Sequence, residues 1–342
     1  MLLLAAAIAA IHLTPPAPPA EYRQPQLAAS SQMVAMTFGS GNAVFFSASR
    51  DGGRTFSKPV KVAESTKLYL GRHRGPRVAI TPSAIVISAI VGESGDLKSW
   101  RSTDGGKSWA GPVTVNDVPA ASREGLHAMA AGGNVLFATW LDLRTKGMKL
   151  YGARSEDGGA TWSKNISVYE SPDGTICTCC HPSLAVDAKG TVHVMWRNVL
   201  AGNRDMYVAR SGDGGRTFAK AIKSGEGTWP LNACPMDGGG LAITEKGEIV
   251  SAWRRDKEVF LAGVAKPESK MEVGKDPAIA AGPGGIYAVW SSGEAVHARI
   301  PGKPQPVTLA ARGAYPQVVA VPGGAVLAAW ESKGEIVVLP LR

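Results

Sequence analysis

The sequence has 342 residues, of which 44% are hydrophobic, and its formal net charge is +9. Its 41 glycines and 23 prolines favour many short strands joined by tight turns. The basic residues are scattered, with small groups at Arg72–Arg77 and Arg254–Arg255, and no four of them are consecutive. This distribution argues against nucleic-acid binding and fits a pocket for a carboxylate or phosphate better.

Residues 1–20 have the composition of an export leader. Met1–Ile11 is apolar but too short to span a bilayer, and small residues around Ala17 and Ala20 offer a cleavage site. Thr14–Pro19 is proline-rich and predicts a tether. We therefore expect a periplasmic or secreted protein with no transmembrane segment after processing.

A short motif, Ser-x-Asp-Gly-Gly-x-Thr/Ser-aromatic, occurs four times. Its aspartates are Asp51, Asp104, Asp157 and Asp213, so the copies are 53, 53 and 56 residues apart. The aspartate caps a tight turn, the two glycines permit positive φ angles, and the aromatic ring covers the turn against a sheet. We expect these turns to lie between the outer strands of repeated units and to be structural.

The strand pattern continues beyond the last of these turns. Large apolar residues end the second strand of each repeat, at Phe38, Ile90, Trp140, Trp196, Trp253, Trp290 and Trp330. The pattern predicts an all-β protein in which residues 21–342 form a single β-propeller of six or seven four-stranded blades, with seven favoured. The last repeat ends after three strands, near Leu341, so an N-terminal segment is expected to supply its fourth strand and close the ring.

Chemically rich segments precede the predicted innermost strands, and these strands begin at one end of the channel. The segments are Tyr22–Pro25, Arg72–Arg77, Arg123–His127, Cys177–His181, Asn232–Asp237, Lys275–Asp276 and Arg312–Tyr315. The other loops are short and bland. The contrast places the functional site at the mouth of the channel.

The four turns and several inner segments resemble the Asp-box (BNR-repeat) sialidase-like β-propeller superfamily. Tyr22–Leu27 is similar to the segment that opens sialidases, and Thr191–Asn198 is similar to the stretch with their second arginine. The resemblance implies that the substrate carboxylate is bound by three arginines, and it implies a tyrosine nucleophile. These residues are Arg23, Arg197, Arg255 (or Arg254) and Tyr315. A guanidinium fork matches a planar carboxylate.

Two departures from that family concern carboxylates. The glutamate that activates the tyrosine is replaced by Cys180 or His181, and the first blade has Gly39–Asn42 where the acid/base aspartate belongs. Glu124, Asp237 and Asp276 are the remaining substitutes. The first functional hypothesis is therefore a sialidase-type glycoside hydrolase for an anionic glycan or small carboxylate ligand, whose anion binding is better supported than its turnover.

All four cysteines fall in two loops: Cys177, Cys179 and Cys180 in one, and Cys234 in the next. In an exported protein, structural disulfides are the ordinary interpretation. The alternatives are a redox-active thiol pair or a Cu or Zn site that includes His181. We expect Cys179 or Cys180 to lie close to Cys234, beside His181. The second functional hypothesis is a non-catalytic periplasmic propeller that binds a soft metal.

Three histidines, His73, His127 and His181, head inner strands and could meet in the channel mouth. Each one taken alone fits a structural role at least as well.

Overall fold

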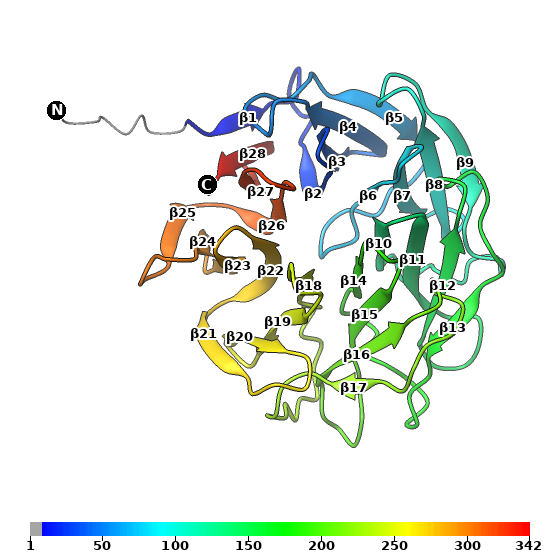
Figure 1. Cartoon of the computed structure of the whole chain (residues 1–342). Helices are drawn as coiled ribbons and strands as arrows, with labels where there is room; N and C mark the ends of the chain where they lie inside the picture. Colours follow the sequence, from blue (N-terminus) through cyan, green and yellow to red (C-terminus); the bar gives the residue numbers. More distant parts are fainter. Residues whose placement is uncertain (1–8) are drawn as a thin grey trace.

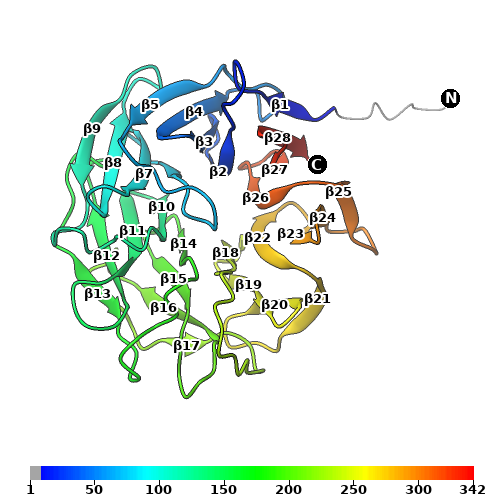
Figure 2. The ribbon, with the colours of Figure 1, turned by 180° about the vertical axis from the view of Figure 1, so that it is seen from behind.

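The computed structural model describes residues 9–342, so most of the apolar run expected in the leader, residues 1–8, lies outside it. Seven four-stranded antiparallel sheets form the blades of a closed ring, seen from its two faces in Figures 1 and 2. The prediction of an all-β propeller with seven blades is confirmed. Among residues 9–342, no helix has the length and hydropathy needed to span a bilayer.

In blades 1 to 6, the chain runs from the inner strand outward. The first three blades are β2 (Arg23–Ala29), β3 (Val34–Ser40), β4 (Ala43–Ser49), β5 (Val60–Glu64); β6 (Arg77–Ile80), β7 (Ile85–Val91), β8 (Asp96–Ser102), β9 (Ala110–Thr114); and β10 (His127–Gly132), β11 (Val135–Asp142), β12 (Lys149–Ser155), β13 (Ile166–Tyr169). The next three are β14 (Ser183–Val186), β15 (Val192–Arg197), β16 (Met206–Ser211), β17 (Ile222–Lys223); β18 (Gly240–Ile243), β19 (Ile249–Arg255), β20 (Glu258–Gly263), β21 (Ser269–Val273); and β22 (Lys275–Gly282), β23 (Gly285–Ser292), β24 (Ala295–Arg299), β25 (Val307–Ala310).

Blade 7 joins the two ends of the chain. It consists of β26 (Ala314–Ala320), β27 (Val326–Ser332), β28 (Glu335–Pro340) and, outermost, β1 (Ile11–Leu13). β1 pairs antiparallel with β28, with Ile11 opposite Val338. The N-terminal segment therefore supplies the missing fourth strand, as the sequence predicts.

This closure bears on the boundary that we expected at residue 20. β1 lies inside the expected leader, so cleavage near Ala20 would remove the strand from blade 7. Leu13 is buried in the core between blades 7 and 1, and Glu335 accepts hydrogen bonds from His12 and Thr14. Residues 11–13 are thus part of the propeller in this structure. A molecule that has been cleaved near Ala20 cannot retain the pairing of β1 with β28.

The core lies between neighbouring blades. Trp140 of β11, for example, packs with Val86 and Ile90 of β7 in one buried cluster. The large residues near the ends of the second strands are buried in every blade. They recur in the sequence because each blade must cover one sheet face with the next blade.

The four Asp-box turns lie between the third and fourth strands, at the rim of the ring. In the second, the Asp104 carboxylate accepts hydrogen bonds from the Ser102 hydroxyl (2.7 Å), the Ser108 backbone N–H (3.0 Å) and the Ser108 hydroxyl (2.6 Å). The hydrogen bonds from Ser108 and Ser102 hold the pKa of Asp104 well below its usual range. Gly106 has a φ of 92°, and a Cβ there would collide with the Phe46 ring of blade 1. The turns therefore fasten neighbouring blades together and are remote from the channel.

Candidate functional site

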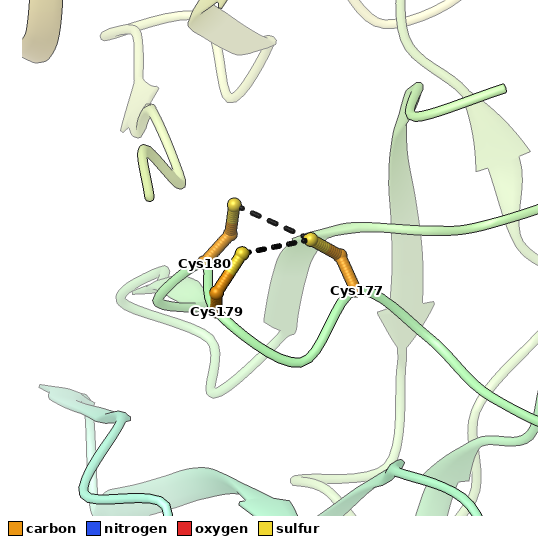
Figure 3. A group of neighbouring side chains, drawn as sticks. All are labelled: Cys177, Cys179 and Cys180. Carbon is orange, nitrogen blue, oxygen red and sulfur yellow. Dashed lines mark hydrogen bonds between the residues drawn. The ribbon is translucent and has the colours of Figure 1, made fainter. Parts of the chain in front are cut away.

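Three thiols converge in the loop between β13 and β14 (Figure 3). The sulfur of Cys177 lies 3.6 Å from that of Cys179 and 3.5 Å from that of Cys180. All three Sγ atoms are within 4.8 Å of one another, and all three residues are buried. We refer to Cys177, Cys179 and Cys180 as the thiol cluster.

Backbone contacts hold the loop in this conformation. The Cys177 N–H donates to the Arg197 carbonyl (3.1 Å), and the Ile176 N–H donates to the Met148 carbonyl (3.0 Å). The loop is thereby attached to β15 and to the third blade. The cluster is thus fixed by main-chain hydrogen bonds, which do not depend on a bond between the sulfur atoms.

A guanidinium lies against the thiol cluster. Nη1 of Arg204 donates to Cys177 Sγ (3.1 Å), while its Nε donates to the Leu231 carbonyl (2.9 Å). Contacts with the Cys179 and Cys180 thiols, aided by the charge of Arg204, outweigh burial and lower the pKa of Cys177. Hydrogen bonding to Cys177, with burial, raises the pKa of Cys179. Cys177 is therefore the member of the cluster whose thiolate form is most favoured.

The second cysteine-containing loop contributes a thioether. Met236 packs against the thiol cluster, as does Val199. Cys234, expected beside Cys179 or Cys180, is exposed and does not belong to the converging group of sulfurs. The sulfur of Cys234 therefore does not join the thiol cluster, and the residue of its loop that packs there is Met236.

His181 faces the channel. Its Nε2 lies 3.2 Å from the Gly239 carbonyl, and its ring stacks on His73 with centroids 4.1 Å apart. Burial, together with the charges of His73 and Arg77, holds the pKa of His181 well below its usual range. His127, by contrast, is fully buried and contacts the Ser88 hydroxyl at 3.0 Å, which is a packing role.

The channel contains a cavity of about 310 Å³ that is lined at one end by His73, His181 and Asp276. Nε2 of His73 lies 2.7 Å from the Asp276 carboxylate, and the ring of Tyr315 meets the ring of His73 edge-on at 5.0 Å. Burial acts to raise the pKa of Asp276, but its contact with His73 outweighs burial and lowers it. This dyad could hold and move a proton at the cavity wall.

Inner strands with Gln24, Asp276 and Tyr315 begin in the same unusual way. Each of these residues precedes a proline, has a φ between 51° and 55°, and sits in a break of the strand register. Such bulges redirect a side chain out of the regular alternation. The backbone N–H of Gln24 donates to the Glu331 carboxylate (2.8 Å), and the backbone N–H of Asp276 donates to the Asp237 carboxylate (2.9 Å). The sequence signal for Gln24, which we missed, is this shared X-Pro at the head of an inner strand.

The three arginines implied by the family resemblance each have partners within the protein. Arg197 is 1% exposed, and its guanidinium donates to the carbonyls of Asp237, Arg204 and Arg254 at 2.8–3.2 Å. Arg255 forms a two-pronged ion pair with Glu268, whereas Arg254 lies over the Trp229 ring and donates to the Asp256 carbonyl. Arg23, 3.7 Å from Glu331, lines a separate hollow of about 590 Å³.

The carboxylates proposed as substitutes do not reach the tyrosine. Within residues 9–342, the Tyr315 hydroxyl has one hydrogen bond, accepted from the Arg72 backbone N–H at 2.9 Å. Glu124 pairs with Arg74, and Asp276 is engaged by His73. The arrangement therefore lacks the carboxylate partner that a sialidase-type tyrosine nucleophile needs.

Comparisons with known proteins agree with the fold. Residues 83–250 match the BNR repeat-like domain family. No curated protein matches the sequence. An α-L-arabinofuranosidase of Fusarium graminearum, solved with an iminosugar inhibitor, is 14% identical, with a TM-score of 0.59 and 97% of each chain covered. The intramolecular trans-sialidase of Ruminococcus gnavus is 11% identical (TM-score 0.55; 94% of this chain and 92% of that one), and virginiamycin B lyase of Staphylococcus aureus is 12% identical (TM-score 0.60; 98% and 99%). Such low identity establishes a shared fold alone.

Proposed function

We propose that this β-propeller, whose residues 83–250 match the BNR repeat-like domain family, binds a soft metal ion, Cu or Zn, through the thiol cluster. The observation that carries this proposal is the convergence of three buried Sγ atoms within 4.8 Å of one another. Thiolates are the preferred protein ligands of these ions.

The spacing of the sulfurs suits a metal better than a set of disulfides. Ligand sulfurs about 2.3 Å from a tetrahedral ion lie roughly 3.8 Å from one another, close to the 3.5 and 3.6 Å between the Cys177 sulfur and its neighbours. A disulfide within the cluster would use two of the three thiols and leave the third buried without a partner. Met236 and Val199 cover the cluster and would shield a bound ion from water.

Elemental analysis with matched cysteine variants tests the proposal. The full chain, reduced under anaerobic conditions, is loaded with Cu(I) or Zn(II) and desalted, and its metal content and free thiols are counted. We expect close to one ion per chain in the wild type and in Cys234→Ser, and loss of the ion in Cys177→Ser. Equal metal content in wild type and Cys177→Ser, or no metal in a folded wild-type protein, would overturn the proposal; the melting temperature reports whether each variant is folded.

A second candidate function is recognition of an anionic glycan or small carboxylate at the channel mouth, followed by glycoside hydrolysis. The observation in its favour is the cavity wall formed by His73, His181 and Asp276, with Arg72 and Tyr315 alongside. Solved structures of similar fold include an arabinofuranosidase and a trans-sialidase. In this candidate function, His73 and Asp276 accept and donate the proton during hydrolysis, because no carboxylate contacts the Tyr315 hydroxyl.

Calorimetric titration of sialic acid and of a uronic acid tests this second candidate. We expect binding by the wild type, at least tenfold weaker binding by His73→Ala (roughly 1.4 kcal/mol), and unchanged binding by Cys234→Ser. Failure of both acids to bind would remove the candidate.

We also propose that the protein is exported. Cell fractionation with mass measurement of the mature chain tests this: recovery in the periplasm or medium supports export, and the mass shows whether β1 is retained.

A further inference from the structure

We infer that the thiol cluster takes Cu(I) in preference to Zn(II), and that Met236 is its fourth sulfur ligand. This inference rests on the proposed metal binding and specifies the ion and the complete ligand set. It depends on two observations: where Met236 is held, and which donor atoms converge with the sulfurs.

Met236 reaches the thiol cluster from the neighbouring blade. It lies in the loop between β17 and β18, whereas the three cysteines precede β14, and its side chain packs against them. Its φ is 59°, a conformation that residues with a Cβ rarely adopt. Asp237, the next residue, fixes the loop by accepting the Asp276 N–H at 2.9 Å. The strained backbone is thus held in the one loop that delivers a thioether to the cysteines.

The harder donors near the cluster do not converge on it. Nε2 of His181, the residue after Cys180, contacts the Gly239 carbonyl, and its ring stacks on His73. Nδ1 of His181 is buried without a hydrogen-bond partner, but neither ring nitrogen belongs to the converging group of sulfurs. The Asp237 carboxylate accepts the N–H groups of Asp276 and Gly239. In residues 9–342, the one converging group of three or more His, Cys, Asp or Glu ligands is the thiol cluster.

This donor set separates the two ions. A closed zinc site takes four ligands from cysteine, histidine and carboxylate, and here a fourth such ligand is missing. Thioether sulfur is a soft donor that suits Cu(I). Three cysteines and one methionine therefore complete a site for Cu(I) and leave Zn(II) one ligand short.

Competition titrations of wild type and Met236→Leu test the inference. Reduced full-length protein is titrated anaerobically with Cu(I) against bathocuproine disulfonate, and separately with Zn(II) against a chromogenic zinc chelator. Met129→Leu, a substitution of a buried methionine in another blade, is the matched control. Because thiols in general favour Cu(I), the decisive result is the effect of Met236→Leu on each ion.

We expect the wild type to bind Cu(I) more tightly than Zn(II). Met236→Leu should weaken Cu(I) binding about tenfold and leave Zn(II) binding unchanged, while Met129→Leu changes neither. Tighter Zn(II) binding, or unchanged Cu(I) binding in Met236→Leu, would overturn this inference and leave the proposed metal binding standing. If Cys177→Ser still binds both ions as the wild type does, the proposed function itself is contradicted.

Discussion

Replacement of Arg197 by methionine separates a structural role from a ligand-binding role. The guanidinium is 1% exposed and donates to three backbone carbonyls, those of Asp237, Arg204 and Arg254. A buried acceptor that loses its donor costs about 1–3 kcal/mol. Water entering the vacated space recovers part of this cost, so we expect a loss of about 3 kcal/mol in the free energy of unfolding.

That loss converts into a measurable change in melting temperature. Unfolding entropy is about 2.1 cal/mol/K per residue, which for 342 residues gives roughly 0.7 kcal/mol/K. Arg197→Met should therefore melt about 4 °C below the wild type in differential scanning calorimetry. Arg23→Met, at a half-exposed position, is the control and should melt within about one degree of the wild type. Unchanged melting of Arg197→Met with lost binding of a carboxylate ligand would refute the structural role and restore the interpretation drawn from the family resemblance.

Three further predictions concern stability. Asp157→Ala should lower the free energy of unfolding by roughly 0.5–2 kcal/mol, by analogy with helix caps, because Asp157 accepts hydrogen bonds from Thr161 and Ser155. Elemental analysis should show unchanged metal content. An unchanged melting temperature together with lost metal would contradict this prediction. The pKa of Asp104 is lowered in the folded state, so its contribution is present above the ordinary carboxyl pKa and is lost as the pH falls through the native value; Asp104→Asn should therefore show a shallower fall in melting temperature on acidification below about pH 4. Leu13→Ala, in the strand that closes the ring, should cost about 2 kcal/mol in urea unfolding, and an unchanged midpoint would mean that β1 does not pair in solution.

The fold could be predicted from the sequence because its determinants are local and repeated. Each Asp-box turn needs its aspartate and glycines within a few residues, and each second strand needs a large residue to fill the space between two blades. Trp140 and Trp196 therefore mark the same place in successive repeats. The seventh blade was predictable for the same reason, although it has no Asp box.

The roles of the arginines could not be predicted in this way. The sequence around Arg197 is similar to the sialidase segment, but whether a guanidinium faces a ligand or the main chain depends on carbonyls from three separate segments. Arg255 is neutralised by Glu268, which lies outside the recognised segment. Similarity of a short segment conveys the position of the backbone and says little about the partners of a long side chain.

The cysteines illustrate an intermediate case. The spacing of Cys177, Cys179 and Cys180 within one loop made their proximity predictable. The contact from the second loop depends on how its backbone runs: Met236, which has a left-handed φ, packs against the cluster, whereas Cys234 is exposed. A loop of six residues offered both sulfurs, and the sequence alone did not distinguish them.

The pairing of Ile11 with Val338 has a consequence for biogenesis. These partners are separated by 327 positions, so the blade that they share cannot be completed until the chain has been synthesised as far as Val338. Contacts this distant in sequence form slowly, because the entropy of closing so large a loop must be overcome first. During synthesis, residues 11–13 must wait without a partner while six blades assemble from their own neighbouring strands. Until β1 pairs with it, the edge of β28 is uncovered and is open to pairing with another chain.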